Sequence, residues 1–331
     1  MAEAAGPPSQ SSDSGLSGRY PWVIPLTALL ATGAFLGVST NLAKLADGVG
    51  LNPLAFLTWS VVGATAILVG INTARGRLPP FNARSIEYFA VAGLVSIAAP
   101  NLLSFAAVPN VGAGFVTLSI SFPPLFTYLG ALALGMERFQ ISRAAGVTLA
   151  LGGAVLLAVY KLSEPDIDPF WVVVTLTAPV VLAIGNIYRT ARWPDGAAPD
   201  ELAPGMLAAS AFLLLAIGAV TGSLGEGTTQ FSLAVPMDRA GPMVVILAQT
   251  ATFSCMYLLY FVLQKYGGPV YFSLLGSVAA VVGVPIAVFV LGEGPPRGLA
   301  IGGVLIAIGV GLLTFGHSEE IETSQPSPDA E

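Results

Sequence analysis

Residues that could build a disulfide framework or a metal centre are almost absent from this sequence. Its 331 residues include one cysteine, Cys255, and one histidine, His317. Disulfide frameworks need several cysteines, and zinc or haem sites need several cysteine or histidine ligands. We therefore expect no disulfide scaffold, no metal site and no cofactor.

Charged residues are also scarce. They make up 10% of the chain, whereas apolar residues make up 54%. In soluble domains about a quarter of the residues are charged, so this composition indicates an integral membrane protein. The 19 acidic residues outnumber the 13 basic ones. The chain therefore lacks the basic face that nucleic-acid binding requires.

Long apolar stretches account for most of the chain. A helix needs about 20 predominantly apolar residues to cross a bilayer. Ten stretches are candidates: Trp22–Lys44, Leu54–Thr73, Glu87–Val108, Gly112–Gly135, Ala144–Tyr160, Phe170–Arg189, Leu202–Thr221, Met243–Gln264, Gly268–Leu291 and Gly298–Phe315. The short connections leave no room for a soluble domain. We expect an all-α integral membrane protein with ten transmembrane helices.

Residues 101–157 are repeated later in the chain. They align without a gap to residues 257–313, and 14 of the 57 positions are identical. The identities include the LLxF motif, three glycines, and Glu137 with Glu293. An internal duplication of a membrane bundle is typical of transporters. We expect two five-helix repeats, residues 21–161 and 169–316, between disordered tails, residues 1–20 and 317–331.

Both tails are polar, and the first has no apolar run, so we do not expect a signal peptide. Lysine and arginine are retained on the cytoplasmic side of a membrane. If the N-terminus is cytoplasmic, nine of them face the cytoplasm and four face the other side. Since five helices per repeat is an odd number, the second repeat is then inverted. We expect two inverted repeats with both termini in the cytoplasm.

The first helix of each half ends with a similar polar motif. The first ends in Asn41-Leu-Ala-Lys44, and the sixth ends in Asn186-Ile-Tyr-Arg189. A spacing of three places the amide and the cation on one helical face. This recurrence supports the duplication independently.

The repeated pattern resembles the EamA branch of the drug/metabolite transporter superfamily. It stands as LGMERFQISRAAGVTLALGGAVLL in the first half and as LGEGPPRGLAIGGVLIAIGVGLL in the second. The resemblance covers roughly residues 22–315. It implies a bacterial inner-membrane carrier that works by alternating access. Members of this family commonly export amino acids, related metabolites or drugs.

Uncharged polar side chains at mid-span depth are the substrate-binding candidates, because a polar group in lipid must find a partner or water. The candidates are Asn41, Asn101, Ser104, Ser121, Asn186, Gln249, Tyr257, Tyr260 and Ser277. The repeat pairs three of them across the halves: Asn101 with Tyr257, Ser104 with Tyr260 and Ser121 with Ser277. The alternative is that they bond helix backbone or permit close helix packing.

Prolines stand near the middle of several expected helices. They are Pro100, Pro123, Pro124, Pro179 and Pro285. Each removes a backbone donor and frees a carbonyl one turn earlier, which is tolerated where a helix lines a cavity or packs on a neighbour. We hypothesise that helices one, three, four, six, eight and nine line the pathway. Ordinary kinks are the alternative.

Charged residues near the helix ends allow two readings each. Lys44 and Arg189 either attract a carboxylate at the two mouths of the pathway or extend to the interface. Proton-driven carriers usually keep an ionisable group in the pathway, and here every carboxylate falls in a tail, a loop or a helix end. We therefore favour facilitated transport. The alternative is a proton-coupled antiporter that uses Glu137 or Glu293, although these carboxylates could simply close helix ends.

The amides, hydroxyls and phenols suit a neutral or zwitterionic, partly apolar substrate, such as an amino acid. We expect export of such a metabolite. An enzyme is disfavoured because the sequence has no GxSxG, HExxH or P-loop motif. A non-transporting subunit is disfavoured because the sequence has no extramembrane domain. The expected partners are a small-molecule substrate and the lipid bilayer, for a monomer or homodimer that does not bind nucleic acid.

Overall fold

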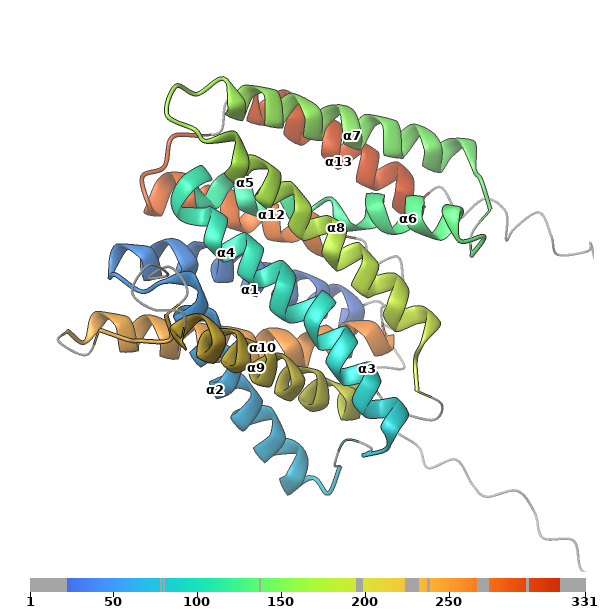
Figure 1. Cartoon of the computed structure of the whole chain (residues 1–331). Helices are drawn as coiled ribbons and strands as arrows, with labels where there is room; N and C mark the ends of the chain where they lie inside the picture. The colour runs from blue at the N-terminus through green and yellow to red at the C-terminus, as the bar shows by residue number, and fades with distance from the viewer. Residues whose placement is uncertain are drawn as a thin grey trace, which may run out of the picture.

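The computed structural model describes residues 23–77, 79, 81–136, 138–194, 199–223, 232–236, 239–266, 274–295 and 298–315. The two predicted tails and Glu137 lie outside the described residues. The described part of the chain forms a helical bundle (Figure 1).

Each half of the chain contributes a series of antiparallel helices. The first half contains α1 Val23–Gly48, α2 Pro53–Ala74, α3 Ala83–Gly93, η2 Leu94–Ala98, α4 Ala99–Val111, α5 Ala113–Ser119, α6 Pro123–Ala133 and α7 Ile141–Leu162. The second half contains α8 Pro169–Ala191, α9 Pro199–Ser223, α10 Gly241–Tyr266, α12 Leu275–Pro285, η4 Ile286–Val290 and α13 Leu299–Phe315.

Several of these elements join into longer spans. The third span is α3, η2 and α4, the fourth is α5 and α6, and the ninth is α12 and η4. In the described residues, 8 helices are long and apolar enough to cross a membrane. Two shorter apolar helices, Leu275–Val290 and Leu299–Leu312, stand at the ninth and tenth predicted spans. The predicted all-α membrane fold is confirmed.

Proline coincides with helix irregularity at three of the predicted places. The fourth span breaks between α5 and α6, directly before Pro123 and Pro124. A π-helical turn, η2, ends two residues before Pro100, and another, η4, begins directly after Pro285. Because proline lacks the N–H and clashes with the carbonyl one turn earlier, it forces such local changes of hydrogen bonding. Pro179 instead lies inside a continuous α8.

Helices from the two halves pack against each other throughout the bundle. α7 lies along α13 at one edge, and α2 lies along α9 (Figure 1). Between these pairs, α1 contacts α10 and α12, while α8 contacts α4 and α6. The boundary between the halves, which we call the seam, therefore runs through the whole bundle.

Glycines allow the closest of these approaches. A Cβ atom at Gly37 of α1 would lie 2.6 Å from the backbone oxygen of Ala279 and 2.9 Å from the nitrogen of Gly283 on α12. At the edge, a Cβ at Gly153 of α7 would lie 2.7 Å from the oxygen of Gly302 on α13. These glycines pack helices together within the bundle, as small residues commonly do in membrane proteins.

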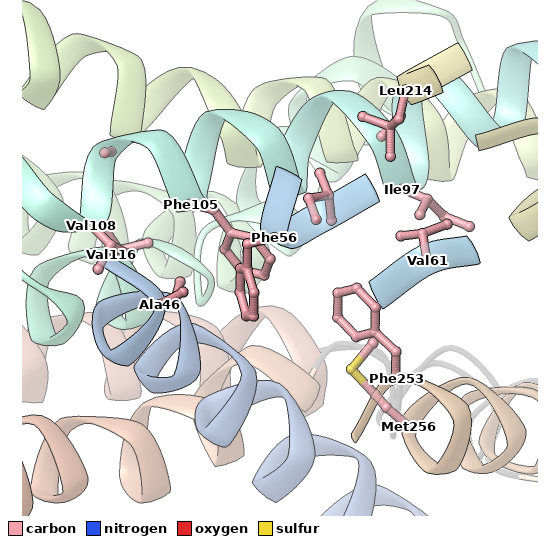
Figure 2. Close-up of a cluster of buried hydrophobic side chains, with 14 of the residues drawn as sticks. Ala46, Phe56, Val61, Ile97, Phe105, Val108, Val116, Leu214, Phe253 and Met256 are labelled. Carbon is pink, nitrogen blue, oxygen red and sulfur yellow. The ribbon is translucent and has the colours of Figure 1, made fainter. Parts of the chain in front are cut away.

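Aromatic side chains fill the interior where α2, α4 and α10 meet (Figure 2). The ring centroids of Phe56 and Phe105 are 5.4 Å apart, and those of Phe105 and Phe253 are 6.3 Å apart. Met256, one turn from Phe253, packs in the same cluster. Such ring pairs at 4.5–7 Å contribute roughly 0.5–1.5 kcal/mol beyond their buried area.

The close contact between α1 and α12 predicts that a methyl group added at Gly37 destabilises the protein. We expect Gly37→Ala to lower the melting temperature of the purified protein, because overpacking typically costs about 1–3 kcal/mol. Gly70→Ala is the matched control, since nothing lies within 4 Å of a Cβ at Gly70. Equal melting temperatures for the two variants would show that α1 and α12 are not in close contact.

Candidate functional site

Asn101 and Tyr257, which the repeat aligns, meet across the seam. Asn101 is half-buried on α4, and its Nδ2 donates a hydrogen bond to the oxygen of Ile97 at 2.7 Å. The Asn101 side chain also lies close to the side chain of Tyr257, which is buried on α10. This contact joins the third span of the first half to α10 of the second half, away from the ends of both spans.

Tyr257 belongs to a column of aromatic rings along α10. Its ring centroid is 5.7 Å from that of Phe253 and 6.2 Å from that of Tyr260. Ser104, the repeat partner of Tyr260, is buried on α4. The two predicted tyrosines therefore lie on one continuous aromatic face.

Asn41 joins α1 to α12. Its Nδ2 donates to the oxygen of Gly37 at 2.8 Å and to the oxygen of Gly283 at 3.0 Å. Its Oδ1 is buried and has no hydrogen-bond partner among the described residues. The amide therefore links the two halves while keeping one acceptor unused.

Gln249 and Ser121 make two further polar contacts across the seam. Nε2 of Gln249 on α10 donates to Oγ of Ser39 on α1 at 2.6 Å. Oγ of Ser121, in the break between α5 and α6, donates to the oxygen of Gly276 on α12 at 3.1 Å. Ser277, the repeat partner of Ser121, follows directly and is half-buried.

Asn186 and Arg189 lie on one face of α8, as their spacing predicts. Nη2 of Arg189 donates to Oδ1 of Asn186 at 2.7 Å, and Nδ2 of Asn186 donates to Oγ1 of Thr127 at 3.4 Å. The Arg189 side chain is only 6% exposed, and its Cζ lies 5.4 Å from the ring centroid of Tyr260. Lys44 is half-buried near the end of α1. Roles at the pathway mouths stay predictions for both residues.

Three aromatic residues near Arg189 were not predicted from the sequence. Tyr88 of α3 is 1% exposed, and its ring stacks on Tyr188 at 6.1 Å and meets Trp193 edge-on at 6.3 Å. Aromatic residues within a turn or two of a helix end were an available signal, because tyrosine and tryptophan concentrate at this depth. The packing of Tyr188 and Trp193 against Tyr88 cannot be read from the sequence.

Glu293 closes the start of α5. Its Oε1 accepts a hydrogen bond from the backbone N–H of Ala113 at 2.8 Å, and its Oε2 accepts one from Gly114 at 3.0 Å. The preceding residue, Gly112, has a φ of 87°, which favours glycine. A carboxylate at a helix N-terminus satisfies unpaired amides and complements the helix dipole. The helix-end reading of Glu293 is confirmed.

The first half of the chain matches a known family of proteins. The model of the EamA-like transporter family matches residues 23–159. The chain is similar to this family over its first half. This similarity identifies it as a multi-pass membrane transporter and not as an enzyme.

Individual relatives match most of the chain at low identity. A WAT1-related protein of Arabidopsis thaliana is 22% identical over 321 residues, covering 89% of this chain and 90% of the relative. A protein of Streptantibioticus cattleyicolor, described as a "Probable terminal-alkyne amino-acid exporter", is 26% identical over 310 residues, covering 91% and 96%. A solved structure described only as "Crystal structure of protein" covers 91% of this chain and 99% of its own, with a TM-score of 0.57 and 20% identity. That likeness supports the fold.

The Glu293 carboxylate at the start of α5 predicts an order of melting temperatures for the wild-type protein and two variants. Glu293→Ala removes the acceptor of two amides, and hydrogen bonds to a charged group contribute about 1.5–3 kcal/mol each. Glu293→Gln keeps one oxygen acceptor, so we expect melting temperatures to fall from wild type through Glu293→Gln to Glu293→Ala. Glu164→Gln is the control, because its ion pair with Lys161 is partly exposed and should contribute little. Wild-type stability in Glu293→Ala would contradict the capping role.

Proposed function

We propose that this protein exports a small neutral or zwitterionic metabolite, resembling an amino acid, by alternating access between two inverted five-helix repeats. The proposed setting is a bacterial inner membrane, with both chain termini in the cytoplasm. The observation on which this proposal depends most is the close approach of the repeat-related residues Asn101 and Tyr257.

That contact supports the inverted arrangement for a geometric reason. When a two-fold axis relates two repeats, a residue can touch its own counterpart only near the axis. In inverted-repeat carriers this axis lies in the membrane plane, and the substrate site lies near the midplane where the halves meet. A contact between Asn101 and Tyr257 is therefore expected beside a central site.

A second pair of contacts supports the same symmetry. Asn41 on α1 bonds the oxygen of Gly283, and Asn186 on α8 bonds Thr127. Asn41 and Asn186 are counterparts in the two polar motifs. Thr127 and Gly283 are counterparts in the 101–157 repeat, at the same offset as Glu137 and Glu293. Each asparagine thus contacts the equivalent position of the other half.

The polar residues at the seam supply the proposed substrate site. Amides and hydroxyls from α1, α4, α8 and α10 alternate with the aromatic column of α10. This mixture suits a ligand with polar groups and some apolar surface. The relative from Streptantibioticus cattleyicolor, described as an amino-acid exporter, supports a substrate of this kind. Because both oxygens of Glu293 are engaged at a helix end, we favour facilitated over proton-coupled transport.

Counterflow in proteoliposomes tests the transport activity. Purified protein is reconstituted with excess unlabelled amino acid inside, and uptake of the labelled amino acid is followed across a panel of amino acids. We expect saturable exchange of at least one member above protein-free liposomes. We expect Tyr257→Phe to reduce that exchange about 3- to 30-fold, because the hydroxyl that could hydrogen-bond a substrate beside Asn101 is lost.

The controls for counterflow are a neutral exposed substitution and a check of folding. Phe81→Ser changes an exposed side chain between helices and should keep full exchange. Each variant is compared by melting temperature before assay. If no member of the panel exchanges through well-folded wild-type protein, the proposed transport of amino-acid-like metabolites is wrong.

Single-cysteine labelling tests the inverted arrangement separately. In a Cys255→Ser background, Arg138→Cys and Gly294→Cys report the two related connections, and both native side-chain positions are exposed. We expect a membrane-impermeant maleimide added to intact cells to label only Gly294→Cys, because inverted repeats put these connections on opposite sides. Labelling of both variants, or of neither before the membrane is permeabilised, would contradict the inversion.

A further inference from the structure

Arg189 is a buried cation without a carboxylate partner among the described residues. Its side chain is 94% buried, and the groups around it are the amide of Asn186 and the ring of Tyr260. A charge inside a membrane protein ordinarily pairs with another charge or faces water. Neither partner of Arg189 carries a negative charge to balance it.

Two buried polar atoms also lack hydrogen bonds, one in the Arg189 side chain and one in the Tyr88 side chain. Nε of Arg189 and Oη of Tyr88 have no partner among the described residues. Tyr88 stacks on Tyr188, the residue before Arg189, and its hydroxyl is near enough to the guanidinium for the two to interact electrostatically. Buried donors are seldom left without an acceptor, because an unmade hydrogen bond destabilises the folded state. Both groups can donate, so together they suit an acceptor that carries negative charge.

We propose that Arg189 and Tyr88 bind the carboxylate group of the transported molecule. Nε–H of Arg189 and the hydroxyl of Tyr88 would donate to its two oxygens, while Asn186 holds the guanidinium through Nη2. This inference rests on the proposed transport function and adds the group by which the substrate is recognised.

The surroundings favour a carboxylate attached to an apolar body over a phosphate. One guanidinium balances a single negative charge, whereas a phosphate commonly recruits several cationic or backbone donors. The rings of Tyr260 and Tyr257 continue from Arg189 toward the centre of the seam. They provide apolar surface for the rest of the molecule.

The site draws on both halves of the chain. Tyr88 lies on α3 in the first half, and Arg189 and Tyr260 lie on α8 and α10 in the second half. These helix ends converge at the right of Figure 1. In the proposed orientation this is the cytoplasmic end, where an exporter takes up its substrate. Movement of the halves would therefore change the distances between the three side chains.

Binding of matched acid and amide probes tests the proposal. The pairs are L-phenylalanine with L-phenylalaninamide, 3-phenylpropionate with 3-phenylpropionamide, and butyrate with butyramide. Dissociation constants are obtained from ligand-dependent melting temperatures of the purified full-length chain. We expect at least one acid to bind wild-type protein about 10- to 100-fold more tightly than its amide, because hydrogen bonds that involve a charged group are stronger than neutral ones.

The variants separate recognition from folding. Arg189→Gln should abolish the acid preference, Arg189→Lys should retain part of it, and Tyr88→Phe should weaken it while keeping its sign. Lys161→Gln removes a cation on the peripheral helix α7 and should leave the preference unchanged. If Arg189→Gln does not fold, Arg189→Lys and Tyr88→Phe still report on the site. Preference for phenylpropionate over phenylalanine would assign a simple monocarboxylate, and the reverse would assign a zwitterion.

The contrary outcomes distinguish this inference from the proposed function. If wild-type protein binds no acid more tightly than its amide, the carboxylate site is wrong, whether or not counterflow is observed. If amides exchange as well as acids in counterflow, transport stands and carboxylate recognition fails. An acid preference that survives in a folded Arg189→Gln protein also overturns the assignment.

Discussion

Polar side chains within a membrane bundle have to find their partners inside the protein, and the rest of this structure depends on that constraint. Here many of the partners lie across the seam. Asn41 bonds a backbone oxygen of α12, Gln249 bonds a serine of α1, and Asn101 lies close to Tyr257. Because lipid offers no competing hydrogen bonds, these contacts fix which helices of the two halves lie together.

The same contacts leave some polar atoms without a partner. Oδ1 of Asn41, Oε1 of Gln249 and Nε of Arg189 are buried and unbonded among the described residues. Elsewhere in the bundle many serines and threonines bond the backbone of their own helix, as Ser60 and Thr175 do, although the hydroxyls of Thr58 and Ser85 also lack a partner among the described residues. Unused hydrogen-bonding capacity at the seam is what a site for a polar molecule requires, whereas a purely structural contact would use it fully.

Hydropathy was sufficient to predict the helical spans, because each had to be long and apolar enough for a bilayer. The break before Pro123 followed from the chemistry of proline, and the repeat offset pointed to Asn101 and Tyr257 as a related pair. The burial of Arg189 could not be predicted, because sequence gives its depth along α8 but not which helix covers it. Tyr88 was missed for the same reason, since its contact with α8 depends on the rotation of α3. The acceptors of Asn41 and Asn186 on other helices likewise depend on packing.

In the proposed mechanism, the two halves enclose a polar site that opens to either side of the membrane in turn. The most direct measurement is the reactivity of Tyr257→Cys, in a Cys255→Ser background, toward a small hydrophilic thiol reagent. The reagent is added to vesicles of right-side-out or inverted orientation. We expect labelling from both sides, with protection by a transported solute. Labelling from one side only, or none in folded protein, would contradict it.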